Sequence, residues 1–525
     1  MPQSALRREN IHPMPPSGDI SPSPASNHPG PPVSTPDSNH HLSRQLNLRD
    51  LVLSQILTVV GSSWVGLAAG LGHAQTLVWL FAFAVFYAPM AVAVFYLNRE
   101  MPLEGGLYVW ARRSFGDTLG FLTAWNIWAY GLFVIAFLLF QLPSEFAFMV
   151  GPSAAWIPDN HLIVLTSLAV LLTLLTLSAI RGLALGKWIH NVSGIAMMTA
   201  FALLIFAPFW AYAHHLPIHY TPFELHLPKT DPTSLALIGQ IIFAASGLEY
   251  IAIMAGEAKS PSRDIGLSII IASPIIVVMF ILGTASVLAF QELNHSTINY
   301  IAPIPQTLRL AFGDSSIATL LARFVILLLQ IRILGAASFI FAGVARLPMA
   351  AGWDHLIPAW FSRLHPRYRT PTHSILVATG IIAALIVLGS AGVHAAEAFN
   401  VLNNASTEFY AIAYLALFAI PLLASILAPI LASKRRANKS LAAQGLPAKP
   451  LFTRPIPLWV TLLSAVGFLS TLFTFLLNAY PFDTAAAPLP FAAKILGCTL
   501  LINLIGYAFY RSRSLRPTST KIPSS

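Results

Sequence analysis

Apolar runs of about twenty residues recur between residues 50 and 510, and they constrain the fold more than any other feature of the sequence. Each run has the length that an α-helix needs to cross about 30 Å of hydrocarbon. Of the 525 residues, 56% are hydrophobic and only 10% are charged, whereas soluble domains average about 25% charged residues. A soluble core cannot account for this composition. The chain is therefore predicted to be an all-α polytopic membrane protein, with the lipid bilayer as its surroundings.

The runs predict twelve transmembrane helices. Their approximate positions are 50–72, 76–98, 118–142, 161–180, 188–212, 234–256, 265–290, 316–345, 372–390, 398–425, 457–478 and 490–510. Residues 1–46 are rich in Pro, Ser, Asn and His and contain no apolar run, so they are predicted to form a disordered cytosolic tail. Residues 433–456 are predicted to be a basic cytosolic linker, and residues 512–525 a second cytosolic tail.

Basic residues are distributed unevenly among the segments between the runs. If the N-terminus is cytosolic, only Lys229, Arg309 and Lys494 fall on the outer side. Cytosolic loops carry an excess of Lys and Arg, so both termini are predicted to be cytosolic. The net charge of +10 then reflects membrane topology and not a nucleic-acid partner. We expect a multi-pass protein of the plasma membrane.

Neither the cysteine nor the histidine pattern predicts a metal site. The single cysteine, Cys498, lies within the last run, which excludes an intramolecular disulfide and a cysteine metal cluster. Four histidines, at positions 214, 215, 219 and 226, follow the fifth run without a recognisable ligand spacing. A solvated loop is favoured over a metal site there, and no cofactor is predicted.

Two of the runs are interrupted by small residues. The interrupting residues are Gly61, Ser62, Ser63, Trp64 and Val65 in the first run and Phe243, Ala244, Ala245, Ser246 and Gly247 in the sixth. A break in a membrane helix frees backbone N–H and C=O groups, which is tolerated only where they line a cavity or meet a ligand. Glu249 follows the second break, and a carboxylate at membrane depth is functional by default. Both breaks and Glu249 are predicted to contact substrate. The alternative is a glycine packing contact with Glu249 turned toward water or a neighbouring helix.

The two breaks divide most of the chain into comparable halves. Five predicted spans begin with each break, in residues 47–232 and in residues 233–432. Because five is an odd number, the second set must run with the opposite membrane topology, as in the inverted repeats of secondary transporters. The last two spans, within residues 457–511, lie outside the repeat.

Four segments of the chain resemble the amino acid–polyamine–organocation permeases. They are Gly61–Val65, Glu104–Trp110 with Phe115–Phe121, Phe243–Glu249 with Gly256–Asp264, and Arg346–Pro348 with Trp353–Pro358 and Thr370–Pro371. The matches lie in the family's order and extend across residues 50–430. The resemblance implies a LeuT-type 5+5 inverted repeat, with substrate held between the two broken helices and flanked by spans 3, 8 and 10. It also implies alternating access driven by a gradient or by exchange.

A transporter of amino acids or related amines is the leading hypothesis. The free N–H groups of a half-helix attract an anion and unwound carbonyls suit an ammonium, so two adjacent breaks can hold an amino acid. A polyamine or organocation permease of the same fold is an alternative, as is a channel or a receptor. No enzyme is expected, because the chain lacks H-E-x-x-H, G-x-S-x-G and Walker sequences.

Four polar residues inside the predicted spans are further candidates for substrate binding. Arg332 and Glu408 lie too deep to reach the membrane surface easily, and we expect them to pair with each other, to contact substrate, or to do both in different states. Asn126 and Tyr130 are four residues apart on one helical face and can present polar groups to a cavity.

The resemblance also bears on what drives transport. Proton-coupled members of the family can carry a lysine in the fifth span, and Met197 stands at or near that position here. Lys187 lies about 15 Å away along the helix and cannot substitute. Exchange, or proton coupling through Glu249 or Glu408, is favoured over sodium coupling, because no carboxylate stands beside Ser338 to form an obvious sodium site.

Overall fold

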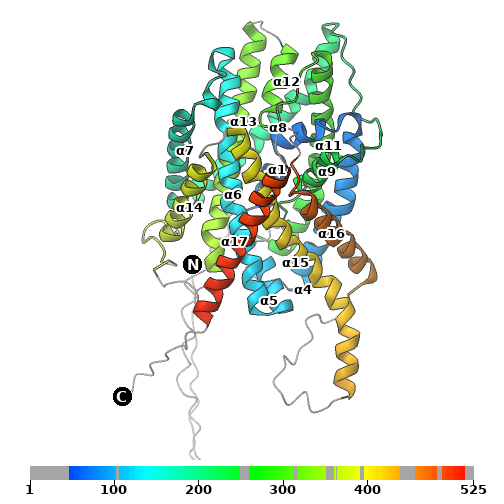
Figure 1. The fold of residues 1–525 in the computed structure, drawn as a ribbon, viewed down its shortest axis with the longest axis vertical. Coiled ribbons are helices and arrows are strands. Elements are labelled where there is room, and N and C mark those ends of the chain that lie inside the picture. The colour runs from blue at the N-terminus through cyan, green and yellow to red at the C-terminus, as the bar shows by residue number, and fades with distance from the viewer. Residues whose placement is uncertain are drawn as a thin grey trace, which may run out of the picture. The chain divides into compact units, whose positions relative to one another are not determined.

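Every regular element in the described part of the chain is a helix (Figure 1). The computed structural model describes residues 46–101, 106–248, 259–312, 316–350, 360–361, 363–390, 395–437, 456–481 and 488–514. The longer helices are α1 (Leu48–Val59), α2 (Ser62–Ala69), α3 (Gln75–Ala82), α4 (Ala88–Glu100), α5 (Leu107–Phe115), α6 (Asp117–Val150), α7 (His161–Arg181), α8 (Leu183–Ala213), α9 (Pro232–Ala244), α11 (Pro261–Leu293), α12 (Pro303–Phe312), α13 (Ser316–Ala350), α14 (Thr372–Ser390), α15 (Ala395–Ala437), α16 (Leu458–Leu477) and α17 (Pro488–Ser514). The short helices are η1 (Gly72–Ala74), η2 (Phe83–Tyr87), η3 (Pro152–Ala154) and η4 (Ile157–Asp159).

The described helices confirm a multi-pass membrane protein. Ten continuous helical segments are long and apolar enough to cross a membrane, and α1 with α2, bent by 44° at a break, makes an eleventh. Helix α9 is apolar but has only 13 residues. The structure describes the chain after it only as far as Leu248, and again from residue 259. The predicted span at 234–256 is therefore described only in part, and the total of twelve spans remains a prediction.

Several helices extend beyond the limits that the apolar runs predicted. Helix α6 was expected to end at residue 142 but continues through Pro143, Ser144 and Glu145 to Val150. These three residues are buried among other helices. Proline and polar groups are tolerated at membrane depth where neighbouring helices satisfy them. A prediction from hydropathy alone therefore ends the helix too early when it meets such residues.

Helix boundaries follow from local chemistry. Asn47 and Asp50 form a capping box at the start of α1, with side-chain to backbone hydrogen bonds of 3.0 and 2.9 Å. Asp231 accepts a hydrogen bond from the Ser234 N–H at 3.0 Å, and Pro232 occupies the first turn of α9. Gly182 alone separates α7 from α8, with a φ of +92° that favours glycine.

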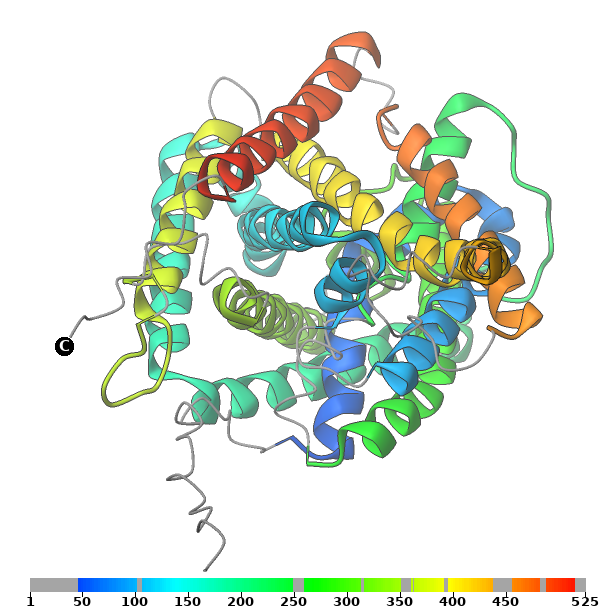
Figure 2. The ribbon, with the colours of Figure 1, turned by 90° about the horizontal axis from the view of Figure 1, so that it is seen from below.

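Helices α6 and α13 lie at the centre of the bundle (Figure 2). In their most apolar stretches, 78% and 61% of the residues are buried by protein, against 28% for α7 and α14 and 22% for α17. The peripheral helices thus present most of their apolar surface outward, as lipid-facing helices do. The centre of the bundle is therefore where polar side chains need an explanation.

Candidate functional site

The first break separates α1 from α2 at Val60 and Gly61. Both residues have extended backbone, with φ/ψ of −79°/120° and −125°/142°. The Trp64 indole covers Gly61 so closely that a Cβ atom there would lie 2.6 Å from Trp64 Cδ1. No side chain caps the N-terminus of α2. The predicted interruption of the first span is confirmed, and it leaves N–H groups of α2 available.

The second predicted interruption coincides with the end of α9 at Ala244. The Ser246 N–H donates to the Phe243 carbonyl at 3.0 Å, and Gly247 has a φ of +115°, a conformation that side chains disfavour. The Gly247 N–H donates to the Tyr414 hydroxyl at 3.1 Å. The helix thus stops at the predicted residues. Glu249 and the rest of that predicted span, to residue 256, lie outside the described residues.

The two interruptions adjoin one another. A Cβ atom on Gly247 would lie 3.6 Å from Val59 Cγ2 and 3.8 Å from the Thr58 carbonyl oxygen. Thr58 and Val59 belong to the last turn of α1, directly before the first break. Segments almost 190 residues apart in sequence therefore meet in the membrane-spanning region, directly before the first break and directly after the end of α9.

A buried carboxylate and a buried guanidinium lie on the first break. Arg332 of α13 donates from Nη2 to the Val60 carbonyl at 2.6 Å, and Ser62 donates from its hydroxyl to Glu145 Oε1 of α6 at 3.2 Å. Arg332 is 3% exposed and Glu145 is fully buried. Their charges attract each other. Because Glu145 Oε2 and Arg332 Nε have no hydrogen-bond partner, both charged groups retain capacity for a ligand.

The structure corrects the expected pairing of Arg332 with Glu408. Arg332 interacts with Val60 and with the charge of Glu145, whereas Glu408 of α15 accepts a hydrogen bond from Asn478 Nδ2 at 3.0 Å. Helix α6 packs against both α13 and α15 and lies between them (Figure 2). Two side chains that lie at the same depth in the membrane need not be neighbours, because another helix can lie between them.

Glu408 belongs to a buried polar network that joins α9, α15 and α16. Its other members are amides. They are Gln240 of α9, Asn403 and Asn404 of α15, and Asn478 at the end of α16. Asn404 and Asn478 exchange two hydrogen bonds, at 2.9 and 2.7 Å, and Gln240 donates to both residues. The network anchors α9 to α15 and α16 before the second break.

Aromatic rings surround Phe243 at the second break. Phe86, Tyr410 and Tyr414 lie 5.4–5.7 Å from it between ring centroids. Tyr130 of α6 stacks on Tyr410 at 3.6 Å, which connects it to this group. The predicted candidate Tyr130 is therefore connected to Phe243 indirectly, because Tyr410 contacts both rings.

Asn126 has a different environment from Tyr130. Its side chain exchanges hydrogen bonds of 2.7 and 3.1 Å with Asn503 of α17, and its Nδ2 also donates to Leu122 of its own helix at 2.8 Å. These contacts use both ends of the amide. The structure thus brings Asn126 to α17 and not to the residues of either break.

The sequence contained only weak signals for the charged and amide groups near the breaks. Glu145 fell beyond the expected end of its span, and Gln240 is a single polar residue in an apolar run. Asn478 lay at the predicted end of another span. A search for isolated carboxylates and amides within one helical turn of the predicted span ends would have found Glu145 and Asn478, but not Gln240, which lies six residues inside its predicted span.

A broken membrane helix that meets the end of another apolar helix beside buried charged side chains is typical of membrane transport proteins. The chain belongs to the amino acid permease family, whose pattern matches residues 47–501. This match confirms the family resemblance inferred from the motifs. The family consists of permeases and not enzymes, as the absence of catalytic motifs had suggested.

Three similar proteins are named as transporters. An uncharacterized transporter of Legionella pneumophila is 22% identical over 72% of this chain and 81% of its own length. Cationic amino acid transporter 5 of Arabidopsis thaliana is 26% identical over 67% of this chain and 61% of its own length. The methylthioribose transporter of Bacillus subtilis is 24% identical over 67% of this chain and 76% of its own length. The similarities support transport without specifying one substrate.

Proposed function

We propose that the protein is a secondary active transporter that moves amino acids or related amines by alternating access. The observation that carries this is the meeting of Gly247 with the end of α1, which places the first break beside the end of α9. Uncapped N–H groups of α2 suit a carboxylate, and carbonyl groups at the ends of α1 and α9 suit an ammonium. An amino acid carries both groups on one carbon atom.

The proposed substrate cradle consists of the residues of the two breaks. It comprises Gly61, Ser62, Ser63, Trp64 and Val65 with Phe243, Ala244, Ala245, Ser246 and Gly247. Arg332 and Glu145 flank the first break with opposite charges. We include Tyr130 as an indirect neighbour, retain Glu249 on the sequence prediction alone, and leave out Asn126 because of its pairing with Asn503. Glu408 enters as a candidate for proton coupling.

The same inference extends to topology. The first broken span and α9 each begin a predicted set of five spans, at 47–232 and 233–432, which supports the inverted repeat with twelve spans in total. The asymmetry of basic residues supports cytosolic termini in the plasma membrane.

An amine without a carboxylate is the second candidate substrate, because Glu145 places a negative charge directly on the first break. A polyamine or other organocation would be attracted to Glu145, whereas Arg332 would oppose it. An amino acid can satisfy both side chains at once. We therefore favour amino acids over organocations.

Uptake by the purified protein in liposomes tests the proposed function. A panel of amino acids and polyamines is offered with and without internal substrate, and saturation with counterflow is expected for a carrier. Unsaturable flux would identify a channel, and binding without flux a receptor. Either result would overturn the transporter assignment.

Coupling is tested in the same liposomes by imposing one gradient at a time. Exchange predicts a requirement for internal substrate. Proton coupling predicts uptake that follows an inward proton gradient and loses this dependence when the responsible carboxylate, such as Glu408, is neutralised to Gln. Uptake that follows sodium alone, without regard to pH or internal substrate, would contradict both mechanisms.

A further inference from the structure

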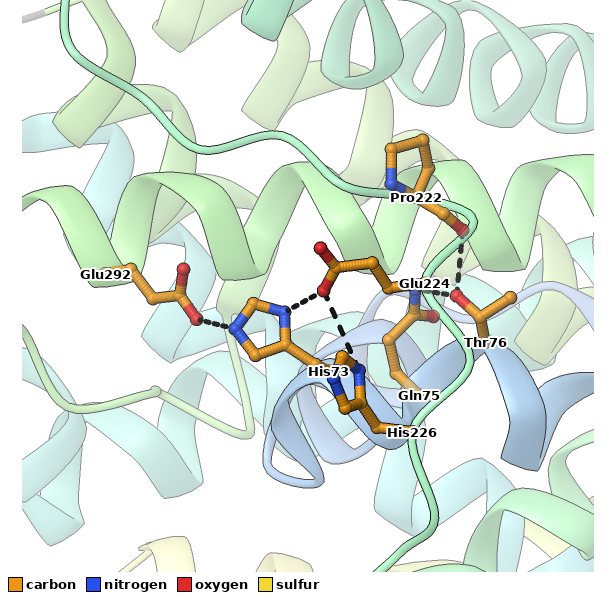
Figure 3. A network of polar contacts seen from close by, with 7 residues as sticks. All are labelled: His73, Gln75, Thr76, Pro222, Glu224, His226 and Glu292. Carbon is orange, nitrogen blue, oxygen red and sulfur yellow. Dashed lines mark hydrogen bonds and ion pairs between the residues drawn. The ribbon is translucent and has the colours of Figure 1, made fainter.

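A charged cluster lies at the end of α2 that is opposite to the first break (Figure 3). His73 in η1 is its centre. The Nδ1 atom of His73 lies 3.2 Å from Glu224 Oε2, and its Nε2 atom lies 3.2 Å from Glu292 Oε1. Glu224 belongs to the connection 214–231 between α8 and α9, and Glu292 to the last turn of α11. One imidazole thus bridges two carboxylates from separate elements.

Two further histidines of the connection face this bridge. His226 Nδ1 lies 3.7 Å from Glu224 Oε2, and the rings of His226 and His219 lie 5.7 and 6.2 Å from the His73 ring. The titratable groups that face His73 are therefore Glu224, His219 and His226 from the connection and Glu292 from α11.

The contacts of His73 suit a protonated ring. A neutral imidazole carries one N–H, so it can donate to one carboxylate while its other nitrogen presents a lone pair to the second. An imidazolium is positively charged and attracts both carboxylates, which lie within ion-pair distance of its two nitrogens although the Nδ1 contact lacks hydrogen-bond geometry. Among the described residues, no group of three or more His, Cys, Asp or Glu side chains is arranged to hold a metal ion. A proton is therefore the ligand that this geometry fits.

Hydrogen bonds beside the cluster join two of the same parts of the chain. The Thr76 hydroxyl at the start of α3 donates to the Pro222 carbonyl at 2.8 Å, and Gln75 Nε2 donates to the Thr76 hydroxyl at 2.6 Å. These bonds hold the same connection a few residues from Glu224 (Figure 3). The turn between α2 and α3, the connection 214–231 and the end of α11 are consequently tied at one place.

We propose that His73, Glu224 and Glu292 form a proton-binding latch. With His73 protonated, the latch holds the connection 214–231 and α11 against the turn that follows α2. A neutral ring no longer attracts both carboxylates, so the latch loosens as the pH rises. The link to transport rests on the proposed function, since α2 is half of the first broken span and its release would permit rearrangement.

Hydrogen exchange measured on the full chain in detergent, without substrate, tests the latch. Rates are corrected for the intrinsic pH dependence of exchange. The amides of residues 214–231 are expected to lose protection about three- to tenfold between about pH 5 and about pH 8, as the half-exposed contacts weaken. His73→Gln should show low protection throughout. His73→Arg should show high protection throughout, because a guanidinium stays charged.

His161→Gln is the matched control, because His161 is an exposed histidine at the start of α7. It should retain the pH step of the native protein. If His73→Gln fails to fold, Glu292→Gln replaces it and should lower protection at acidic pH.

A native protein without a pH step, or a step that persists in His73→Gln, would overturn the latch. The measurement needs no substrate, so absent uptake in liposomes would affect only the proposed transport function.

Discussion

The backbone N–H of Gly247 donates a hydrogen bond to the hydroxyl group of Tyr414 at 3.1 Å, and both groups are buried. Helix α15 therefore holds the residue where the helical path of α9 has ended. Tyr414→Phe would leave the N–H without this partner, and a buried unsatisfied donor costs about 1–3 kcal/mol. We expect Tyr414→Phe to weaken substrate binding while the protein still inserts into the membrane. Uptake kinetics in liposomes and chromatography of the purified variant measure the two properties.

Tyr507→Phe is the control for Tyr414→Phe, because Tyr507 lies at an exposed position on α17 and its hydroxyl accepts a hydrogen bond from Arg511 of the same helix. The control should transport like the native protein. Equal uptake by both variants would mean that the Tyr414 hydroxyl has no role in the proposed site.

Neutralising one member of the Glu145–Arg332 pair should lower the stability of the protein more than neutralising both members. A single substitution leaves an uncompensated buried charge, which costs about 3–5 kcal/mol, whereas the double variant leaves none. We expect Glu145→Gln and Arg332→Gln each to lower thermal stability strongly and Glu145→Gln with Arg332→Gln to recover part of it. Thermal unfolding in detergent checks this order, and uptake by the double variant checks whether substrate preference has changed.

The exposed ion pair Lys494–Glu397 is the control with which the effect of the buried charges on stability is compared. Its atoms are 2.7 Å apart, and its side chains are 51% and 43% exposed. Exposed pairs contribute about 0.2–1 kcal/mol, so Lys494→Gln should hardly change unfolding. Additive effects of Glu145→Gln and Arg332→Gln would show that the two charges are not coupled.

Gly61→Val and Gly247→Val should abolish binding without preventing membrane insertion. At Gly61 the new side chain would collide with the Trp64 indole, whose Cδ1 is 2.6 Å from an added Cβ atom. At Gly247 the φ of +115° is disfavoured for a β-branched residue. Ligand-dependent thermal stabilisation and uptake are the measurements. Gly380→Ala is the control, since an added Cβ atom on Gly380 meets nothing within 4 Å; normal uptake by both valine variants would exclude the two breaks as the cradle.

The start of α9 should become less protected in acid. The hydrogen bonds from the Ser234 N–H and hydroxyl to Asp231 hold the pKa of that carboxyl below its ordinary value. Asp231 then stabilises the helix above the unfolded-state pKa of about 3.9, and this contribution is lost as pH falls through the lower folded-state pKa. Hydrogen exchange in the first turn of α9, corrected for intrinsic rates, should show the loss.

Asp231→Asn should remove the acid dependence at α9, because the amide does not titrate. The first turn of α7, capped by Asn160 through a 3.1 Å hydrogen bond to the Ile163 N–H, gives an internal reference without a titrating cap. A similar acid response at both helices would assign it to a process other than the Asp231 cap.

Hydrophobic runs and small residues predicted the helices and the first break, because both depend on local sequence. The bend at Val60 and Gly61 and the end of α9 at Ala244 coincide with the interrupting residues. Neighbours across the bundle were harder to predict. Arg332 was expected to pair with Glu408, yet the charge near it is that of Glu145, since helix order in space decides which deep side chains meet. Hydropathy also ended α6 before Glu145, although protein surrounds that carboxylate.

The amide network around Gln240 fixes α9 to its neighbours just before the helix ends. Gln240 and Asn478 join α9 to α16, and Asn403 donates to Gln240 from α15 at 3.1 Å, all one turn before α9 ends. Turning α9 would break several buried hydrogen bonds at once, whereas Gly247 lies beyond the end of α9 and its N–H is held by the hydrogen bond to the Tyr414 hydroxyl. If this span moves during a conformational cycle, rotation about Ala245–Leu248 would leave the amide network intact. Helix α16 would then keep α9 in place while the chain beyond it turns.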